Sequence, residues 1–564
     1  MASSRSNETK LSKDAATLRL EAQTDAALRA REDESAQKHA LAILAEHMLQ
    51  PATLHTFEIH GARNTRKSFL DPIFQPLVDD SRNVGTTLGD VFADVQEAVG
   101  KLERFGIFKP DPTVHFADAR QRDPAAAATD YDIAVRVSEL PRFRLNTGTD
   151  LGNTEGSAYG NLLWRNIFGG AESLSLNASA GTRTRSAYSA VLSAPLEGNP
   201  DVRLSLEGLA SATQKPWASH EEVLKGGTVR LGWRVPATGD LHSVAYGSSW
   251  RQLTGLGANA SPTVRRDAGD SLKSSLSHTF TRDRRNNPLL PQSGYLVRTA
   301  SELAGWGPLG GDVAFAKAEA EFSGAVPVVF PNVKAASSTS PASSSSSSTL
   351  ASALGPSSPI ATTASGTDYG ITVGAGFRAG LLYPLPFGYN LFGSGAAPSR
   401  INDRFLLGGP TDVRGFTQGG LGPHDGSDAV GGDVFAAGGV NVLVPITKAG
   451  RDSPLRLQLF ANSGRLVALR TKKQPKPQAA SASDDTEGAA PQQPAGQTSS
   501  QVAQSVSAAL QDLTTGLPST AVGVGLVYAH PVARFELNFS LPLVMRRGED
   551  SRKGLQVGVG INFM

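Results

Sequence analysis

The 564-residue sequence contains no cysteine, and this absence excludes three kinds of chemistry. Without cysteine the chain has no disulfide framework, no thiolate metal site and no cysteine nucleophile. An excess of charge of one sign is also lacking, since 54 Lys and Arg residues oppose 52 Asp and Glu residues. A nearly neutral chain gives no electrostatic reason to expect a nucleic acid partner.

The sequence also lacks long hydrophobic runs. No stretch approaches ~18 consecutive apolar residues, the length that a membrane-spanning helix requires. The lack of such a run does not exclude a transmembrane β-barrel, because the strands of a barrel alternate apolar and polar residues. The N-terminus shows no secretory signal, and residues 1–50 are too rich in acidic residues for a matrix-targeting peptide. A membrane barrel without such a signal is expected in a eukaryotic organelle.

Motifs of common enzymes are missing as well. The chain has no G-x-x-x-x-G-K-[ST] loop, no H-E-x-x-H pair and no G-x-S-x-G elbow. Residues 374–379 match a dinucleotide fingerprint loosely, but they lie inside a predicted strand rather than at a strand-to-helix turn. The sequence therefore predicts neither an enzyme nor a nucleotide, metal or other cofactor site.

The first 141 residues predict an arm followed by a small α/β module. Residues 1–50 are rich in Ala, Leu, Glu and Arg, which favours a helical or disordered arm that is either solvated or partner-binding. The module covers residues 51–141 and predicts the order β-α-α-β-β, with elements at 53–61, 64–77, 87–108, 112–118 and 130–140.

The longer predicted helix of this module, 87–108, is amphipathic. Thr86 or Thr87 is a suitable N-cap, and Gly106 is a suitable stop. Its apolar residues follow i, i+3, i+4 spacing, which predicts one buried face: Leu88, Val91, Val95, Val99 and Leu102.

From residue 142 to residue 564 the pattern becomes that of a mostly β, membrane-spanning antiparallel barrel. About sixteen segments of about ten residues alternate apolar and polar side chains between Gly, Pro, Asn and Asp. A propeller would show a repeat of ~40 residues, which the sequence does not contain. Two low-complexity stretches, 335–367 and 471–517, are expected to be disordered loop insertions.

The alternation is clearest near the C-terminus. In 534–541, the apolar side chains Phe535, Leu537, Phe539 and Leu541 face one way, opposite Arg534, Glu536, Asn538 and Ser540. Such strands suit a bilayer on one side and a wet lumen on the other. Lipid offers no hydrogen bonds to an open sheet edge, so the sheet is expected to close.

One loop string, DRFLLGGPTDVRGF at 403–416, carries the most information. Its key residues are Leu407, Gly408, Gly409, Pro410, Val413, Arg414, Gly415 and Phe416. The string resembles the diagnostic loop of the outer-membrane barrel-assembly superfamily, to which bacterial BamA and the barrel subunit of the mitochondrial sorting and assembly machinery (SAM complex) belong. The resemblance implies that the loop folds back into the barrel lumen.

An arginine inside a lumen needs an acceptor, and its planar fork suits a carboxylate. Many members of the superfamily have an Asp where this sequence has Asn462, within Phe460–Gly464. Glu536, on the polar face of a later strand, is therefore a second candidate partner for Arg414.

Two further resemblances concern the ends of the chain. The order of elements in 51–141 is similar to that of a polypeptide-transport-associated (POTRA) module, which precedes the barrel in this superfamily. The final strand, with Gln556, Gly558, Ile561 and Phe563, is similar to the β-signal of mitochondrial barrel proteins. A single module and the missing secretion signal both favour the mitochondrial branch of the superfamily.

The resemblance implies an insertase of the mitochondrial outer membrane, with the POTRA module in the intermembrane space. β-barrel precursors would enter through a seam between the first strand, Phe143 to Gly152, and the last, Gly554 to Met564. Peripheral SAM subunits and the lipid bilayer are the other implied partners. A passive porin-like channel, a polypeptide-translocating barrel and a soluble β-rich binding protein are the alternatives.

Overall fold

The computed structural model describes residues 47–80, 86–152, 155–331, 366–385, 396–446, 453–469, 498–530 and 533–560. The chain forms two compact units. The smaller unit contains the residues up to 142 with the short segments 165–172 and 197–200, and the larger unit contains the remainder. Among the described residues, no helix is both long and apolar enough to cross a membrane.

The smaller unit has the predicted β-α-α-β-β order. Its sheet has the strand order β1-β3-β2, with β1 parallel and β2 antiparallel to the central strand β3. Two helices pack on the sheet, and their core includes Phe74, Leu102 and Val135. The elements are β1 (Thr53–His60), α2 (Lys67–Asp80), α3 (Leu88–Arg104), β2 (Thr113–Asp118), the short η1 (Ala119–Gln121) and β3 (Asp130–Arg136).

Helix α3 begins at a capping box. The Asp90 amide donates to Thr87 Oγ1 at 3.3 Å, and the Thr87 amide donates to Asp90 Oδ2 at 3.0 Å. Thr87, rather than Thr86, is thus the N-cap, and Gly106 follows the helix with a φ of +69°. Of the predicted face, Val91, Val95 and Leu102 are buried, whereas Leu88 and Val99 are partly buried against the same core.

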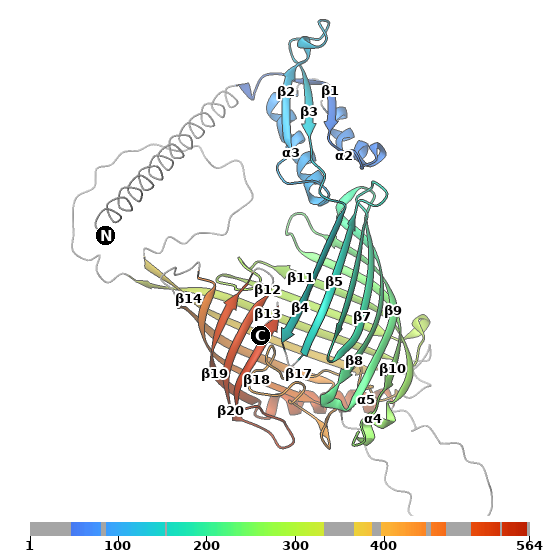
Figure 1. Cartoon of the computed structure of the whole chain (residues 1–564), viewed down its shortest axis with the longest axis vertical. Helices are drawn as coiled ribbons and strands as arrows, with labels where there is room; N and C mark the ends of the chain where they lie inside the picture. Colours follow the sequence, from blue (N-terminus) through green and yellow to red (C-terminus); the bar gives the residue numbers. More distant parts are fainter. Residues whose placement is uncertain are drawn as a thin grey trace, which may run out of the picture. The chain divides into compact units, whose positions relative to one another are not determined.

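The larger unit contains the sixteen strands that the alternation predicts. They form one sheet in the order β21-β20-β19-β18-β17-β14-β13-β12-β11-β10-β9-β8-β7-β6-β5-β4, and Figure 1 shows them as a curved wall. The bounds are β4 (Phe143–Gly152), β5 (Glu155–Arg165), β6 (Ser173–Gly181), β7 (Thr184–Leu196), β8 (Asn199–Lys215), β9 (His220–Arg234), β10 (Leu241–Thr254), β11 (Gly269–Asp283), β12 (Gly294–Ala304), β13 (Phe315–Pro331), β14 (Gly366–Pro384), β17 (Val434–Pro445), β18 (Leu455–Val467), β19 (Ser519–Ala529), β20 (Arg534–Val544) and β21 (Gly554–Gly560).

The two faces of this wall differ in chemistry, as expected. On β20 the polar residues from Arg534 to Ser540 are buried, and the alternating apolar residues from Phe535 to Leu541 are exposed. On β21, Gln556 is buried, whereas Leu555 and Val557 are 59% and 51% exposed. The polar side is called the inner face here, and the apolar side suits contact with lipid chains.

The two edge strands of the sheet lie next to each other. Strand β4 has the predicted bounds, and Cα atoms of β21 lie within 8 Å of Cα atoms of β4. Over the part of both strands that the structure describes, no ladder of hydrogen bonds joins them. The wall therefore curls round until its edges approach, and the described parts of the two strands meet as a seam without a ladder.

The prediction of disorder for 471–517 is wrong for its second half. Residues 499–515 form helix α5 (Ser499–Thr515), and residues 471–497 lie outside the described part of the chain. Val502, Val506 and Ala509 form a buried stripe on α5, and partners such as Leu381 and Tyr383 of β14 pack against its first two residues. This small apolar face, hidden among Gln and Ser, is enough to order the helix against the sheet.

Two other predicted segments fall mostly outside the described residues. For the N-terminal arm 1–50, the structure describes only residues 47–50. The insertion predicted at 335–367 is described only at residues 366–367, which begin strand β14. The remaining small elements of the larger unit are η2 (Pro216–Ala218), α4 (Pro262–Arg266), η3 (Gly307–Leu309), β15 (His424–Asp425) and β16 (Asp428–Ala429).

The capping box of α3 generates a test. Thr87→Ala removes the side-chain acceptor and is expected to cost about 1 kcal/mol of local stability. Hydrogen bonds from Thr87 lower the pKa of Asp90. The ionised Asp90 carboxylate therefore stabilises the helix above the ordinary pKa of Asp, and this stabilisation is lost as pH falls through the lowered pKa. Hydrogen exchange of the α3 amides in the detergent-solubilised full chain should accelerate in Thr87→Ala and at acidic pH.

Thr86→Ala is the matched control, because it removes the neighbouring hydroxyl and leaves the capping box intact. Equal exchange rates in the two variants would show that the cap does not hold this helix.

Candidate functional site

The site is built by the long connection between β14 and β17. Its described residues, 396–433, are called the lumen loop here, and residues 413–416 are its tip. The lumen loop lies against the inner face and precedes the fifth strand from the end. Several of its apolar residues pack with wall residues into one buried cluster, which includes Phe405, Leu407, Val413, Phe416 and Leu421. The loop thus supplies an apolar core inside an otherwise polar wall.

Arg414 at the tip is fully buried, and its planar guanidinium group binds the carboxylate of Glu536. Its Nε donates to Glu536 Oε2 at 2.9 Å, and its Nη2 donates to Glu536 Oε1 at 3.2 Å. Both side chains have no exposed surface. A charge-assisted pair with two parallel hydrogen bonds in a dry site fixes both distance and orientation.

Asn462, on β18, adds a neutral acceptor to this pair. With its amide oxygen turned toward the loop, it accepts from Arg414 Nη1 at 3.1 Å and from the Arg414 amide at 3.2 Å. The guanidinium carbon of Arg414 also lies 5.0 Å from the centre of the Phe460 ring. The structure therefore brings Arg414 together with both candidate partners, and Glu536 supplies the negative charge.

Gly415 and Phe416 connect the tip to the last strand. The Gly415 amide donates to Gln556 Oε1 at 2.9 Å, and Gln556 Nε2 donates to the Phe416 carbonyl at 3.2 Å. Gly415 has a φ of +89°, and a Cβ there would lie 2.7 Å from the Cβ of Ala521. A glycine is required at this position, because any side chain would clash and strain the backbone. Phe416 is fully buried.

The Leu-Gly-Gly-Pro part of the motif shapes the approach to the tip. Leu407 is buried and accepts from the Leu421 amide at 3.0 Å, which closes the loop on itself. Gly408 and Gly409 have φ values of +105° and +136°. Pro410 follows them and lines the cavity described below.

Sequence reasoning missed two charged residues of this site. Asp412 accepts from the Gly408 amide at 2.9 Å and from Arg378 Nη1 at 3.0 Å, so it ties the tip to β14. Arg534 lies 2.5 Å from Glu536 Oε1, which places two arginines on one carboxylate. Asp412 lies inside the quoted motif, and Arg534 lies on the same polar face as Glu536. Both residues could therefore have been predicted as members of the site from the sequence.

The predicted seam residues lie on two different strands. Phe143 is 59% exposed and stacks on Trp164 at 5.1 Å, and Gly152 pairs with Glu155 at the other end of β4. Gln556 and Gly558 lie on β21. The predicted residues Ile561 and Phe563 fall outside the described part of the chain.

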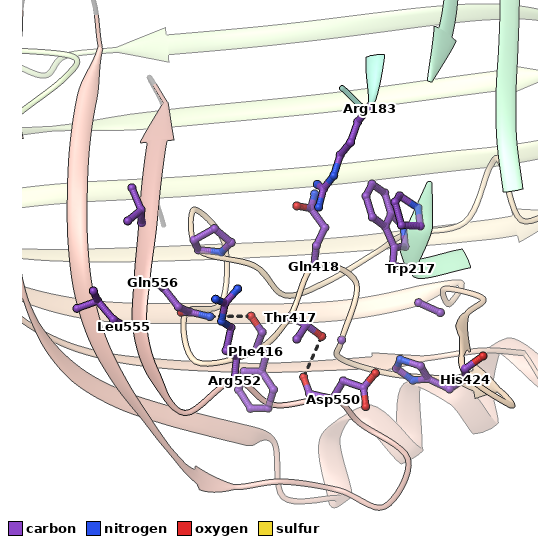
Figure 2. Close-up of a pocket in the computed structure, with 16 residues that line it drawn as sticks. Arg183, Trp217, Phe416, Thr417, Gln418, His424, Asp550, Arg552, Leu555 and Gln556 are labelled. Carbon is purple, nitrogen blue, oxygen red and sulfur yellow. Dashed lines mark hydrogen bonds between the residues drawn. The ribbon is translucent and has the colours of Figure 1, made fainter. Parts of the chain in front are cut away.

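A cavity of about 710 Å³ lies between the tip, β21 and the segment around η2. Figure 2 shows Gln556, Phe416 and Thr417 on one side, and Arg183 and Trp217 on the other. Leu555 and Val557, which face outward, also line it. The cavity therefore reaches past β21 from the inner face toward the lipid-facing side.

The shared carboxylate generates a test of stability. Glu536→Gln would remove the carboxylate that the buried Arg414 and Arg534 share, at an expected cost of about 3–5 kcal/mol. The free energy of unfolding in urea and detergent measures this cost. Glu207→Gln is a matched control, because its fork-shaped pair with Arg230 is partly exposed (29% and 40%) and is expected to contribute less than about 1 kcal/mol. Similar losses in both variants would contradict a buried charge centre at Glu536.

The comparisons with known proteins agree with this geometry. Residues 166–563 match the model of the Omp85 superfamily domain. A SAM50-like protein of Schizosaccharomyces pombe is 34% identical over 524 residues, covering 93% of each chain. The human sorting and assembly machinery component 50 homolog is 29% identical over 480 residues, covering 84% of each chain.

A solved structure shows the same fold. BamA of Haemophilus ducreyi lacking POTRA domains 1–3 superposes with a TM-score of 0.61 and 14% identity, covering 90% of this chain and 84% of that one. At this identity the likeness concerns the fold alone. The resemblance predicted from the loop string is confirmed: the chain belongs to the Omp85 superfamily and, within it, to the family of SAM50-like proteins.

Proposed function

We propose that this protein inserts β-barrel proteins into the mitochondrial outer membrane, and that its clients enter through the seam between β4 and β21. The observation that carries the proposal is the seam itself, where two edge strands lie within 8 Å without a described ladder. The printed names of its relatives, which are components of a sorting and assembly machinery, support the same function.

The physical basis is the cost of an open strand edge in lipid. Each unpaired backbone group in the hydrocarbon costs several kcal/mol, so an opened seam attracts any strand that can pair with it. A client strand satisfies the edge by β-augmentation, and further client strands add to the first. Pairing and lipid burial of the client itself supply the free energy, and no catalytic group is required.

The tip of the lumen loop is placed to govern β21. Gln556 of β21 holds the tip backbone by two hydrogen bonds, and the Arg552 amide donates to the Gly415 carbonyl at 2.9 Å. The adjacent cavity offers space beside β21 for an incoming segment. We infer that the tip keeps the last strand in position while the seam is used.

The smaller unit is proposed to be a single POTRA module that faces the intermembrane space. The order of its strands and helices supports this assignment. Strands β1 and β2 are the edges of its sheet, so β-barrel precursors could add to them there. Peripheral SAM subunits are proposed as partners, since the relatives are named as components of a larger machinery.

A disulfide across the seam tests the lateral route. The chain has no native cysteine, so Leu145→Cys can be combined in turn with a cysteine at each outward residue of β21, Leu555 and Val557, to find a pair that oxidises without interference. Locking the seam is expected to abolish assembly of a radiolabelled β-barrel precursor in isolated mitochondria, and a reductant should restore it. A pair at Leu145 and Leu162, which are register partners in β4 and β5, is the matched control and should leave assembly unchanged.

Client assembly at the normal rate through a locked seam would rule out lateral insertion. Unchanged assembly together with an intact ion conductance would instead favour a passive channel.

A further inference from the structure

The lumen loop is also held at a place outside the key residues of the motif, at the beginning of the string 403–416. Residues 401–405, called the stem here, enter a cluster of charges on the inner face far along the sheet from the seam. Asp403 is 1% exposed and accepts from both Nη atoms of Arg251 on β10, at 2.6 and 3.2 Å. This pair with two parallel hydrogen bonds is separate from the loop's ion pairs at Arg414 and Asp412.

Lysines from two neighbouring strands complete the cluster. Lys317 of β13 donates to the Asp403 carbonyl at 3.1 Å and lies 4.3 Å from the centre of the Phe405 ring. Lys273 of β11 lies 3.8 Å from Asp403 Oδ1 and 2.6 Å from Glu302 of β12. Four consecutive strands, β10 to β13, thus supply charged side chains around one carboxylate of the loop.

The two anchors lie on different parts of the sheet. The stem is bound by β10 to β13, whereas the tip is bound by β18, β20 and β21, and β14 and β17 lie between these groups in the strand order. Only nine residues lie between Asp403 and Val413 at the start of the tip. A chain this short, fixed at one end, has few ways to reach the other anchor.

We propose that Asp403 is a positioning residue: its pairing with Arg251 fixes the stem so that the tip reaches Glu536 and Gln556. The loop then braces the last strands against β10 to β13. This inference rests on the proposed function, because it assigns the brace to strands that border the seam.

The experiment measures the position of the tip directly. Thr417 donates its amide to the Asp550 carbonyl at 3.2 Å, so Thr417→Cys with Asp550→Cys reports whether the tip lies on the β20–β21 turn. A short bis-maleimide is applied to the full chain in lipid nanodiscs, and the crosslinked fraction is scored only for chains that migrate as folded barrels in unheated gels.

Asp403→Asn is expected to lower the crosslinked fraction by about fivefold or more, because it leaves Arg251 without a carboxylate. Arg251→Gln should give a similar loss, and Arg251→Lys should restore part of it by keeping the charge. Glu302→Gln is the matched control: it breaks the pair with Lys273 but leaves the Asp403–Arg251 pair intact, so the yield should equal that of the parent.

A folded Asp403→Asn chain that crosslinks like the parent overturns the inference. If the Asp403→Asn variant gives too little folded protein, Lys317→Met is used instead, because it removes one contact to the stem. A folded Lys317→Met chain that crosslinks like the parent then overturns the inference. Failure of the proposed function would look different: the tip would move in Asp403→Asn, but client assembly would not change in that variant or with a locked seam.

Discussion

The structure depends on one constraint: backbone groups that face hydrocarbon must find their hydrogen bonds within the sheet. Fifteen strand junctions in the sixteen-stranded order satisfy it, and over the residues that the structure describes the junction between β21 and β4 does not. A soluble protein could leave such an edge to water, whereas a bilayer cannot pair it. A strand that pairs with the edges at this junction would remove the cost of their unpaired backbone groups.

An incomplete wall needs reinforcement from inside, and the lumen loop supplies it. The polar inner face contains arginines such as Arg456 and Arg534 at or below 5% exposure, which is tolerable only with partners. The loop brings apolar side chains and the guanidinium group of Arg414 to the same surface. Ion pairs of the loop therefore reach both the strands nearest the open junction, through Arg414 and Glu536, and the strands β10 to β13 far from it, through Asp403 and Arg251.

Patterns within short stretches of sequence were enough to predict much of this architecture. The alternation of β20, the bounds of β4 and the capping of α3 all follow from neighbouring residues, as does the importance of the string around Arg414. Helix α5 was missed because the three residues of its apolar stripe, Val502, Val506 and Ala509, stand in a stretch dominated by Ser, Gln and Ala. The partnership of Asp403 and Arg251 spans 152 residues, and no local spacing marks it.

The separation of Arg414 from Glu536 also bears on how the protein itself matures. The loop leaves the ribosome 122 residues before its carboxylate partner, and 140 residues separate Phe416 from Gln556. Contacts of such long sequence separation form late and slowly. The buried contacts of the lumen loop can therefore form only after the C-terminal hairpin β20–β21 is in place, so filling of the interior is a late step in the folding of this chain.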